Sequence, residues 1–133
     1  MSDFGQEPAL KGQRVLVVED VIENLRLFRA ILQLEGAQVL EAESGPEGIE
    51  IATREQPDII LMDMQMPEMD GLTASRLLRA EPRTQHIPIV VITASAMDED
   101  RRRALEAGCD GYISKPIDPV IFGAQIAEFL PKN

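Results

Sequence analysis

Five short apolar runs recur along the chain, and segments with a helical spacing of apolar residues separate them. The runs are RVLVV (14–18), AQVLEA (37–42), DIILM (58–62), IPIVVI (87–92) and GYIS (111–114). They are too short to be helices, and three are rich in β-branched residues, which favours strands. The second run alternates more than the others, which is typical of an edge strand. Because strands and helices alternate, the sequence predicts an α/β fold with a doubly wound, five-stranded parallel sheet, right-handed crossovers and helices on both faces.

Signals for helix ends lie between these runs. Capping boxes are predicted at residues 44–47 (SGPE) and 95–98 (SAMD). Asp118, which precedes a proline, predicts an N-cap with proline at the first helical position. Gly36 and Gly108 stand where two helices are expected to end. These positions agree with the alternation of strands and helices.

Size and charge restrict the kind of protein. A chain of 133 residues with 44% apolar residues has the size and core of one domain. Acidic residues outnumber basic ones by 23 to 13, so nucleic-acid binding is not expected. The single cysteine excludes an internal disulfide, and no apolar run reaches the roughly 20 residues of a membrane span. We therefore expect a cytoplasmic protein without membrane insertion, with a flexible arm over residues 1–12 and one domain over residues 13–133.

Polar residues stand at the carboxyl ends of the predicted strands, where open α/β sheets bind their ligands. Glu19 and Asp20 follow the first strand, Asp63 the third, Thr93 the fourth and Lys115 the fifth. Some have ordinary structural alternatives: Asp20 could cap the first helix, Thr93 could satisfy backbone groups, and Lys115 could be a surface lysine. Asp63 is harder to explain in this way, because an ionised side chain after a buried strand loses its hydration unless it is paired.

The charges of these residues predict a metal ion. Three carboxylates in one crevice would repel one another and raise one another's pKa values. A divalent cation together with the ammonium group of Lys115 would cancel their formal charge of −3. Oxygen ligands and the lack of a Cys or His cluster favour magnesium or manganese over zinc.

Four ordered motifs resemble the receiver domains of bacterial two-component response regulators, the CheY-like family. The motifs are VLVVED (15–20), DIILMDMQMPEMDG (58–71), VVITASA (90–96) and GYISKPI (111–117). The resemblance runs from about Arg14 to Leu130 and implies a (βα)5 flavodoxin-like fold with the strand order 2-1-3-4-5. The segment EAGCDGYISKPI (106–117) is similar to stand-alone, single-domain regulators of the DivK type.

The resemblance also implies roles for individual residues. Asp63 would be the phosphoacceptor, Thr93 and Lys115 would contact the phosphoryl group, and Thr93 and Tyr112 would move when it is bound. The bond before Pro116 would be cis. The implied ligands of Mg²⁺, or of Mn²⁺ in its place, are Glu19, Asp20, Asp63 and the main-chain carbonyl oxygen of Gln65.

The function expected from the resemblance is a switch and not an enzyme. A histidine kinase or a histidine phosphotransfer protein would supply the phosphoryl group, and a downstream protein would bind in response, with only slow autodephosphorylation. One alternative is an aspartate-nucleophile phosphatase of the haloacid dehalogenase type. Such enzymes typically carry a second aspartate two residues after the first, where this chain has Gln65. The other alternative is an interaction module on the same fold that works without phosphorylation.

Two surfaces are candidates for partner binding. The first helix carries two apolar stripes, one of which includes Leu25 and Phe28, and together they are wider than one core-facing stripe needs. A tilted helix could instead bury both stripes, or they could form a homodimer contact, so a monomer or a weak homodimer is expected. The second surface includes Arg102, Tyr112 and Phe122 of the last two helices and the strand between them.

Overall fold

Strands and helices alternate along the whole described part of the chain. The computed structural model of the protein describes residues 8–94 and 97–131. Its elements are β1 (Arg14–Val18), α2 (Ile22–Leu34), β2 (Gln38–Ala42), α3 (Gly45–Glu55), β3 (Ile59–Asp63), α4 (Gly71–Ala80), β4 (Ile89–Thr93), α5 (Asp98–Glu106), β5 (Gly111–Ser114) and α6 (Phe122–Ala127). The strands form one parallel sheet in the order β2-β1-β3-β4-β5. Both the predicted doubly wound architecture and the strand order implied by the resemblance are confirmed.

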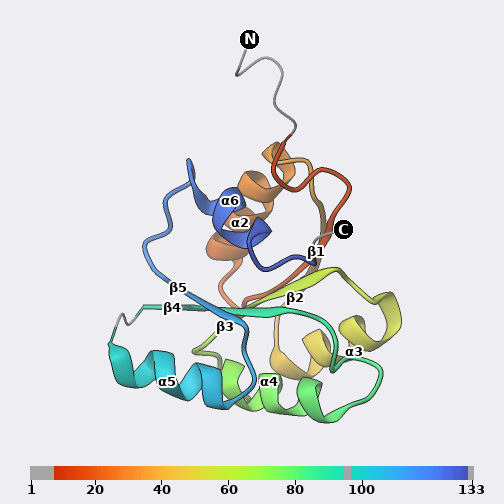
Figure 1. The fold of residues 1–133 in the computed structure, drawn as a ribbon, viewed down its shortest axis with the longest axis vertical. Coiled ribbons are helices and arrows are strands. Elements are labelled where there is room, and N and C mark those ends of the chain that lie inside the picture. The colour runs from red at the N-terminus through yellow and green to blue at the C-terminus, as the bar shows by residue number, and fades with distance from the viewer. Residues whose placement is uncertain (1–7, 95–96, 132–133) are drawn as a thin grey trace.

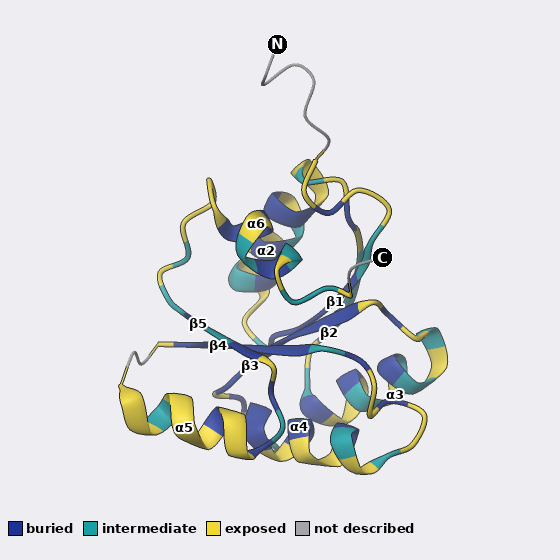
Figure 2. Ribbon diagram, in the orientation of Figure 1, coloured by how far each residue is buried: buried dark blue, intermediate teal, exposed yellow. Residues whose placement is uncertain are grey.

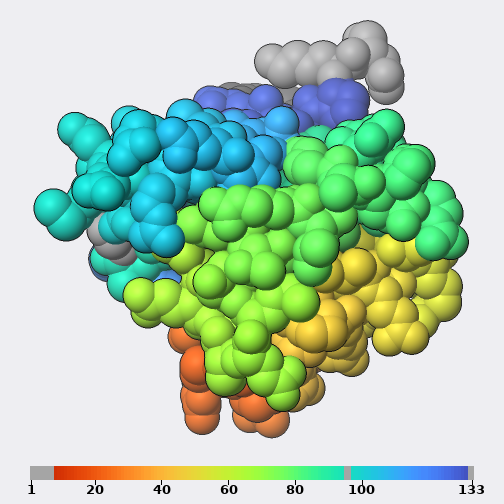
Figure 3. Space-filling model, turned by 90° about the horizontal axis from the view of Figure 1, so that it is seen from below, coloured from red at the N-terminus to blue at the C-terminus, as the bar shows by residue number. Residues whose placement is uncertain are grey.

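The helices cover both faces of the sheet, with α2 and α6 on one side and α3, α4 and α5 on the other (Figure 1). Alternate residues of β1 serve the two sides: Leu16 and Val18 belong to the core beneath α3 to α5, and Val15 and Val17 to the core beneath α2 and α6. Figure 3 shows α3, α4 and α5 side by side over their face. No helix within the described residues has the length and apolar content needed to span a bilayer.

The central strands β3 and β4 are buried throughout, and the edge strand β2 is partly exposed, as expected of an edge strand (Figure 2). The sequence places Asp63 and Thr93 directly after their strands, but each is the last residue of its strand. The hydrogen-bonded pairing of β3 with β4 continues to this end of the sheet: Asp63 pairs with Ile92, and the amide of Met64 donates to the carbonyl of Ile92 at 3.0 Å. Asp63 and Thr93 therefore belong to the sheet and not to the loops that follow it.

Several helix ends lie where the sequence predicts them. The hydroxyl of Ser44 accepts a hydrogen bond from the amide of Glu47 at 3.2 Å and caps α3. Gly36 and Gly108 follow α2 and α5 with φ values of 92° and 96°, a region that suits glycine. Residues 95 and 96 of the other predicted capping box lie outside the described residues.

The predicted helix start at Asp118 is wrong. Helix α6 begins at Phe122, and Asp118 caps a turn ahead of it by accepting a hydrogen bond from the amide of Val120 at 2.9 Å. The same Asp-Pro signal suits a turn as well as a helix, because aspartate can bond the backbone two residues ahead.

The described part of the predicted N-terminal arm, residues 8–12, packs onto the domain. Leu10 is fully buried with the side chains of the α2 and α6 core, and its amide donates to the carbonyl of Glu35 at 2.9 Å. The amide of Ala9 donates to the Glu35 carboxylate at 3.2 Å. Residues 8–12 of the predicted arm therefore contact the domain through Ala9 and Leu10.

Leu10→Ala is expected to lower the free energy of unfolding by about 2–5 kcal/mol, because it removes a fully buried side chain. Val120→Ala, at a position that is 84% exposed, should change it by less than about 0.5 kcal/mol. Urea denaturation followed by circular dichroism measures both. Equal stability of the two variants would show that residues 8–12 do not pack as described.

Candidate functional site

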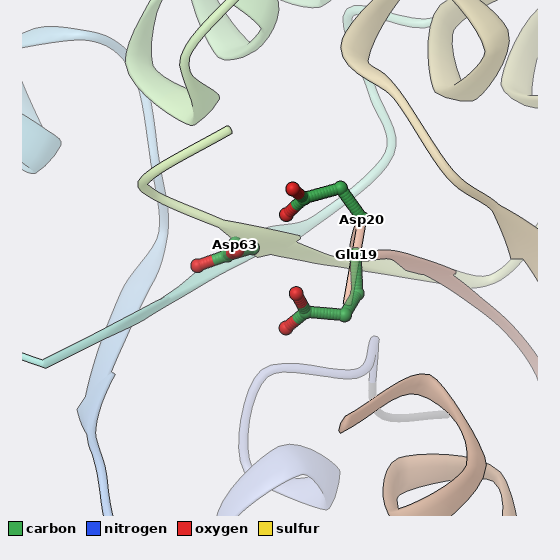
Figure 4. Close-up of side chains that lie close together, drawn as sticks. All are labelled: Glu19, Asp20 and Asp63. Atoms are coloured by element: carbon green, nitrogen blue, oxygen red, sulfur yellow. The ribbon is translucent and has the colours of Figure 1, made fainter. Parts of the chain in front are cut away.

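Three carboxylates meet at the carboxyl ends of β1 and β3. The two strands are neighbours in register, with Val18 opposite Met62, so the next residue of each strand brings Glu19 beside Asp63. Asp20 approaches from the turn into α2 (Figure 4). One oxygen from each of Glu19, Asp20 and Asp63 lies within 4.8 Å of the others. The structure therefore brings the three predicted carboxylates together.

The cluster is largely withdrawn from water. Glu19 is fully buried, Asp63 is 6% exposed, and Asp20 is half-buried. Glu19 Oε2 accepts a hydrogen bond from the amide of Val21 at 3.1 Å, whereas Oε1 has no hydrogen-bond partner among the described residues. Burial raises the pKa of Glu19 to about 7; the amide of Val21 opposes this shift, and the charge of Asp63 adds to it.

Asp20 does not cap α2. The helix begins after Val21, and among the described residues no side chain caps its first amides. The structural alternative for Asp20 therefore has no support in the observed contacts, and its carboxylate points into the cluster (Figure 4).

Lys115 supplies the positive charge beside the cluster. Its Nζ lies 3.6 Å from Asp63 Oδ1 and 3.7 Å from Glu19 Oε1. Its amide donates to the carbonyl of Thr93 at 2.6 Å, and the bond to Pro116 is cis, as the resemblance implies. Both ion-pair distances are longer than a direct hydrogen bond, so the lysine neutralises charge without saturating either carboxylate.

The backbone after β3 folds closely around Asp63. The amide of Gln65 donates to Asp63 Oδ1 at 3.3 Å, and the amide of Gly71 donates to the carbonyl of Met64 at 2.9 Å. Asp70 caps α4 by accepting from the amide of Thr73 at 2.8 Å. A Cβ at position 71 would lie 2.3 Å from the carbonyl oxygen of Asp63, so only glycine allows α4 to start this near the strand end.

A pocket of about 520 Å³ is lined by the loop that follows Asp63 and by the end of β4. Thr93, which is 2% exposed, lies in its wall. Met64 and Met66 line it as well, and they leave only 8% and 9% of their surface exposed. Arg103 of α5 borders the opposite side. The methionines thus form an apolar part of the pocket wall, directly after the strand that carries Asp63.

The predicted partner residues Leu25, Phe28 and Phe122 are core residues. Leu25 and Phe28 are 4% exposed, Phe122 is fully buried, and the two phenylalanine rings stack with centroids 5.8 Å apart. Their burial shows that they hold α2 and α6 on the sheet, although Phe28 also borders a hollow beside Lys115. The other two predictions fit a surface: Arg102 is exposed and Tyr112 is half-buried.

The exposed apolar side chains of α2 and its entry are different ones. Val21, Ile22 and Leu27 are 42%, 38% and 49% exposed. Leu27 also lines a hollow of about 260 Å³ that includes Lys115 and Ile117. Helical spacing shows that residues 25, 28 and 32 share one stripe, but not which stripe faces the sheet, so the sequence alone does not single out Leu27.

The cluster fits a hard divalent cation. All its side-chain donors are carboxylate oxygens, and Glu19 Oε1 is a buried acceptor without a hydrogen bond within the described residues. Magnesium prefers such oxygen donors and keeps part of its water shell, which a half-buried Asp20 permits. The neighbouring ammonium of Lys115 and a divalent ion together balance three carboxylates.

Comparison with known proteins gives a consistent result. Residues 15–126 match the response regulator receiver domain family. The polar-differentiation response regulator DivK of Brucella ovis is 39% identical over 116 residues, which cover 87% of this chain and 94% of DivK. The response regulator PleD of Caulobacter vibrioides is 45% identical over 113 residues, 85% of this chain, but the match spans only a quarter of PleD.

A solved structure extends the likeness to three dimensions. The receiver domain of the sensor histidine kinase PA1611 from Pseudomonas aeruginosa superposes with a TM-score of 0.82 at 33% identity, over 89% of this chain and 97% of that domain. That crystal structure holds a magnesium ion coordinated in the active-site cleft. The family match, the relatives and the shared fold lead to one conclusion: the chain belongs to the response regulator receiver domains.

Proposed function

We propose that this receiver domain is a phosphorylation-dependent switch of a two-component phosphorelay, with Asp63 as phosphoacceptor. The observation that carries the proposal is the position of Asp63: its carboxylate is nearly buried, within 4.8 Å of the carboxylate oxygens of Glu19 and Asp20 and 3.6 Å from the Lys115 ammonium. An aspartate oxygen in this position can act as a nucleophile while its neighbours hold the opposing charges in place.

Glu19, Asp20, Asp63 and the main-chain carbonyl of Gln65 are the proposed ligands of Mg²⁺, which Mn²⁺ could replace. When bound, the ion supplies positive charge to the oxygens of the phosphoryl group. Support comes from the oxygen-only donor set, the buried acceptor Glu19 Oε1, and the magnesium ion in the related PA1611 domain.

The chain's own residues would position the reaction. An Asp63 carboxylate oxygen forms a bond to phosphorus, and the bond from phosphorus to the donor histidine nitrogen breaks. The electron pair stays on that nitrogen, which takes a proton from solvent. Lys115 would pair with the Asp63 carboxylate before the transfer and with the phosphoryl oxygens after it. Thr93 would donate a hydrogen bond from its hydroxyl group to one of these oxygens. This chemistry depends on placement and cations more than on a base.

Several features favour a switch over turnover of a small substrate. The residue two positions after Asp63 is Gln65, an exposed amide that cannot serve as general acid or base in the way a second aspartate does. A haloacid dehalogenase type of phosphatase is therefore disfavoured. A phosphorylation-independent module would have no need for the buried cluster and its lysine, so the geometry also disfavours that alternative.

The donor is proposed to be a histidine kinase or phosphotransfer protein that docks on α2 beside Lys115. The exposed Ile22 and Leu27, and the hollow that Leu27 shares with Lys115 and Ile117, form an apolar surface at the edge of the acidic cluster. On this surface the exposed Leu27 takes the place of the buried Leu25, and Phe28 contributes only where it borders the hollow. The response is proposed to be altered binding of a downstream protein, with the chain acting as a monomer or weak homodimer.

Incubation with acetyl phosphate and Mg²⁺ is expected to add one phosphoryl group to the protein, detected by intact mass, because Asp63 lies beside the cations. Asp63→Asn should gain none, and EDTA should abolish labelling of the parent protein. Rapid release of phosphate with catalytic turnover would favour the phosphatase. No labelling under any of these conditions would favour the phosphorylation-independent module.

Millimolar Mg²⁺ is expected to raise the free energy of unfolding by about 1–3 kcal/mol, because only the folded chain assembles the carboxylate cluster. Asp20→Asn should remove most of this gain. Glu50→Gln is the matched control, since it deletes one negative charge at an exposed position of α3. Thermal unfolding with and without the ion measures the effect; an equal gain in both variants would argue against the proposed metal site.

Leu27→Asp should slow phosphoryl transfer from a histidine kinase that labels the parent protein by about tenfold or more, because an apolar contact would be replaced by a charge. Labelling by acetyl phosphate should stay unchanged. Leu77→Asp is the control, because Leu77 on α4 is exposed to a similar extent, 46% against 49%. If both variants were slowed equally, the docking surface would lie elsewhere.

A further inference from the structure

Three consecutive arginines of α5 differ in what they contact. Arg102 and Arg103 each pair with acidic side chains of the same helix, at distances between 3.0 and 3.7 Å. The guanidinium carbon of Arg101 instead lies 5.6 Å from the centre of the Tyr112 ring. Within residues 8–94 and 97–131, no carboxylate oxygen lies within 4.0 Å of the Arg101 side-chain nitrogens. Arg101 is therefore the arginine whose charge is directed at an aromatic ring.

The ring that Arg101 contacts shares a face of the sheet with Thr93. Val91 pairs with Tyr112 and Thr93 with Ser114 across β4 and β5. Side chains two residues apart on a strand project to the same face, so Tyr112 and Thr93 both lie on the side that α5 covers. Tyr112 packs against the apolar core of that side.

The three side chains lie at different depths. Thr93 is 2% exposed at the end of β4, Tyr112 is half-buried, and Arg101 is exposed on α5. Arg101 and Tyr112 also line a hollow of about 250 Å³ between α5 and the segment before α6. A ring that moved toward Thr93 would therefore move inward, away from the exposed guanidinium.

We propose that Arg101 is a positioning residue that holds the Tyr112 ring on the α5 side of β5 and opposes its movement toward Thr93. A cation over an aromatic ring at an exposed site changes an equilibrium by a factor of about two to five. This inference rests on the proposed function, in which Thr93 donates to a phosphoryl group on Asp63, and it adds that Thr93 moves toward that group and leaves space for the ring. Because coupling between two sites is reciprocal, loss of Arg101 would then tighten the binding of a phosphoryl-like anion at Asp63.

Simple electrostatics predicts the opposite sign. Removing a positive charge from α5 should weaken the binding of an anion, or leave it unchanged where salt screens the charge. Arg102 is the matched control, because it is the next residue of the same helix and is also exposed. If the phosphoryl-like anion binds more tightly to Arg101→Ala but not to Arg102→Ala, the change in net charge cannot be the cause, because both variants lose one positive charge.

The experiment compares the parent with Arg101→Ala, Arg101→Lys and Arg102→Ala. The chain has one tyrosine and no tryptophan, so its tyrosine emission reports on Tyr112 alone. Arg101→Ala should alter this emission in the free protein and tighten binding of beryllium trifluoride with Mg²⁺ about two- to fivefold. Arg101→Lys should stay within twofold of the parent, since it retains a cation. Arg102→Ala should leave the emission unchanged and should not tighten binding.

Unchanged emission in Arg101→Ala, or binding of beryllium trifluoride that is equal to or weaker than that of the parent, would overturn the inference. Far-ultraviolet circular dichroism of each variant checks that α5 remains folded. If the parent itself failed to bind beryllium trifluoride, the proposed function would fail. The emission of free Arg101→Ala would still decide separately whether Arg101 positions the ring.

Discussion

Repulsion among carboxylates at one rim of a buried sheet is the constraint on which the rest of this structure depends. Glu19 directly follows β1 and Asp63 ends β3, and these two strands are adjacent and in register, so the sheet brings the two acidic groups together. Lys115 compensates only part of this charge, and a buried acceptor of Glu19 has no hydrogen bond within the described residues. Such an arrangement destabilises the free protein locally and favours any ligand that brings positive charge. Separating the two carboxylates would require β1 and β3 to shift relative to each other, which would disrupt their pairing.

Most of the fold can be predicted from the sequence, because each short apolar run is bounded by residues that stop or cap helices. Burial of all residues in β3 and β4 follows from their continuous apolar sequence, and the exposure of β2 follows from its alternation. Local signals were less reliable where one pattern suits two structures. Asp118 with the following proline describes a turn as well as a helix start, and Leu10 is a single apolar residue without any period to mark it.

The acidic cluster can also be predicted from the sequence, because the carboxyl ends of parallel strands lie at one edge of the sheet. The surfaces around the cluster cannot be predicted in this way. Leu25 and Phe28 are apolar residues of a surface helix, and only the face that α2 turns toward the sheet decides that they are buried while Leu27 is exposed. The contact between Arg101 and Tyr112 likewise depends on how α5 lies against β5. The positions of α2 and α5 on the sheet cannot be predicted from residue spacing alone. Periodicity identifies the residues that share a helix face, but not the element that this face packs against.

The docking of Leu10 has a practical consequence for where this domain can be cut. Similarity to the family starts at residue 15, which invites a shortened protein that begins near β1. That truncation would delete a fully buried leucine and uncover the apolar ends of α2 and β1 beneath it. The newly exposed apolar patch would make the shortened domain prone to aggregation during purification. A boundary ahead of Pro8 keeps Leu10 packed over the core.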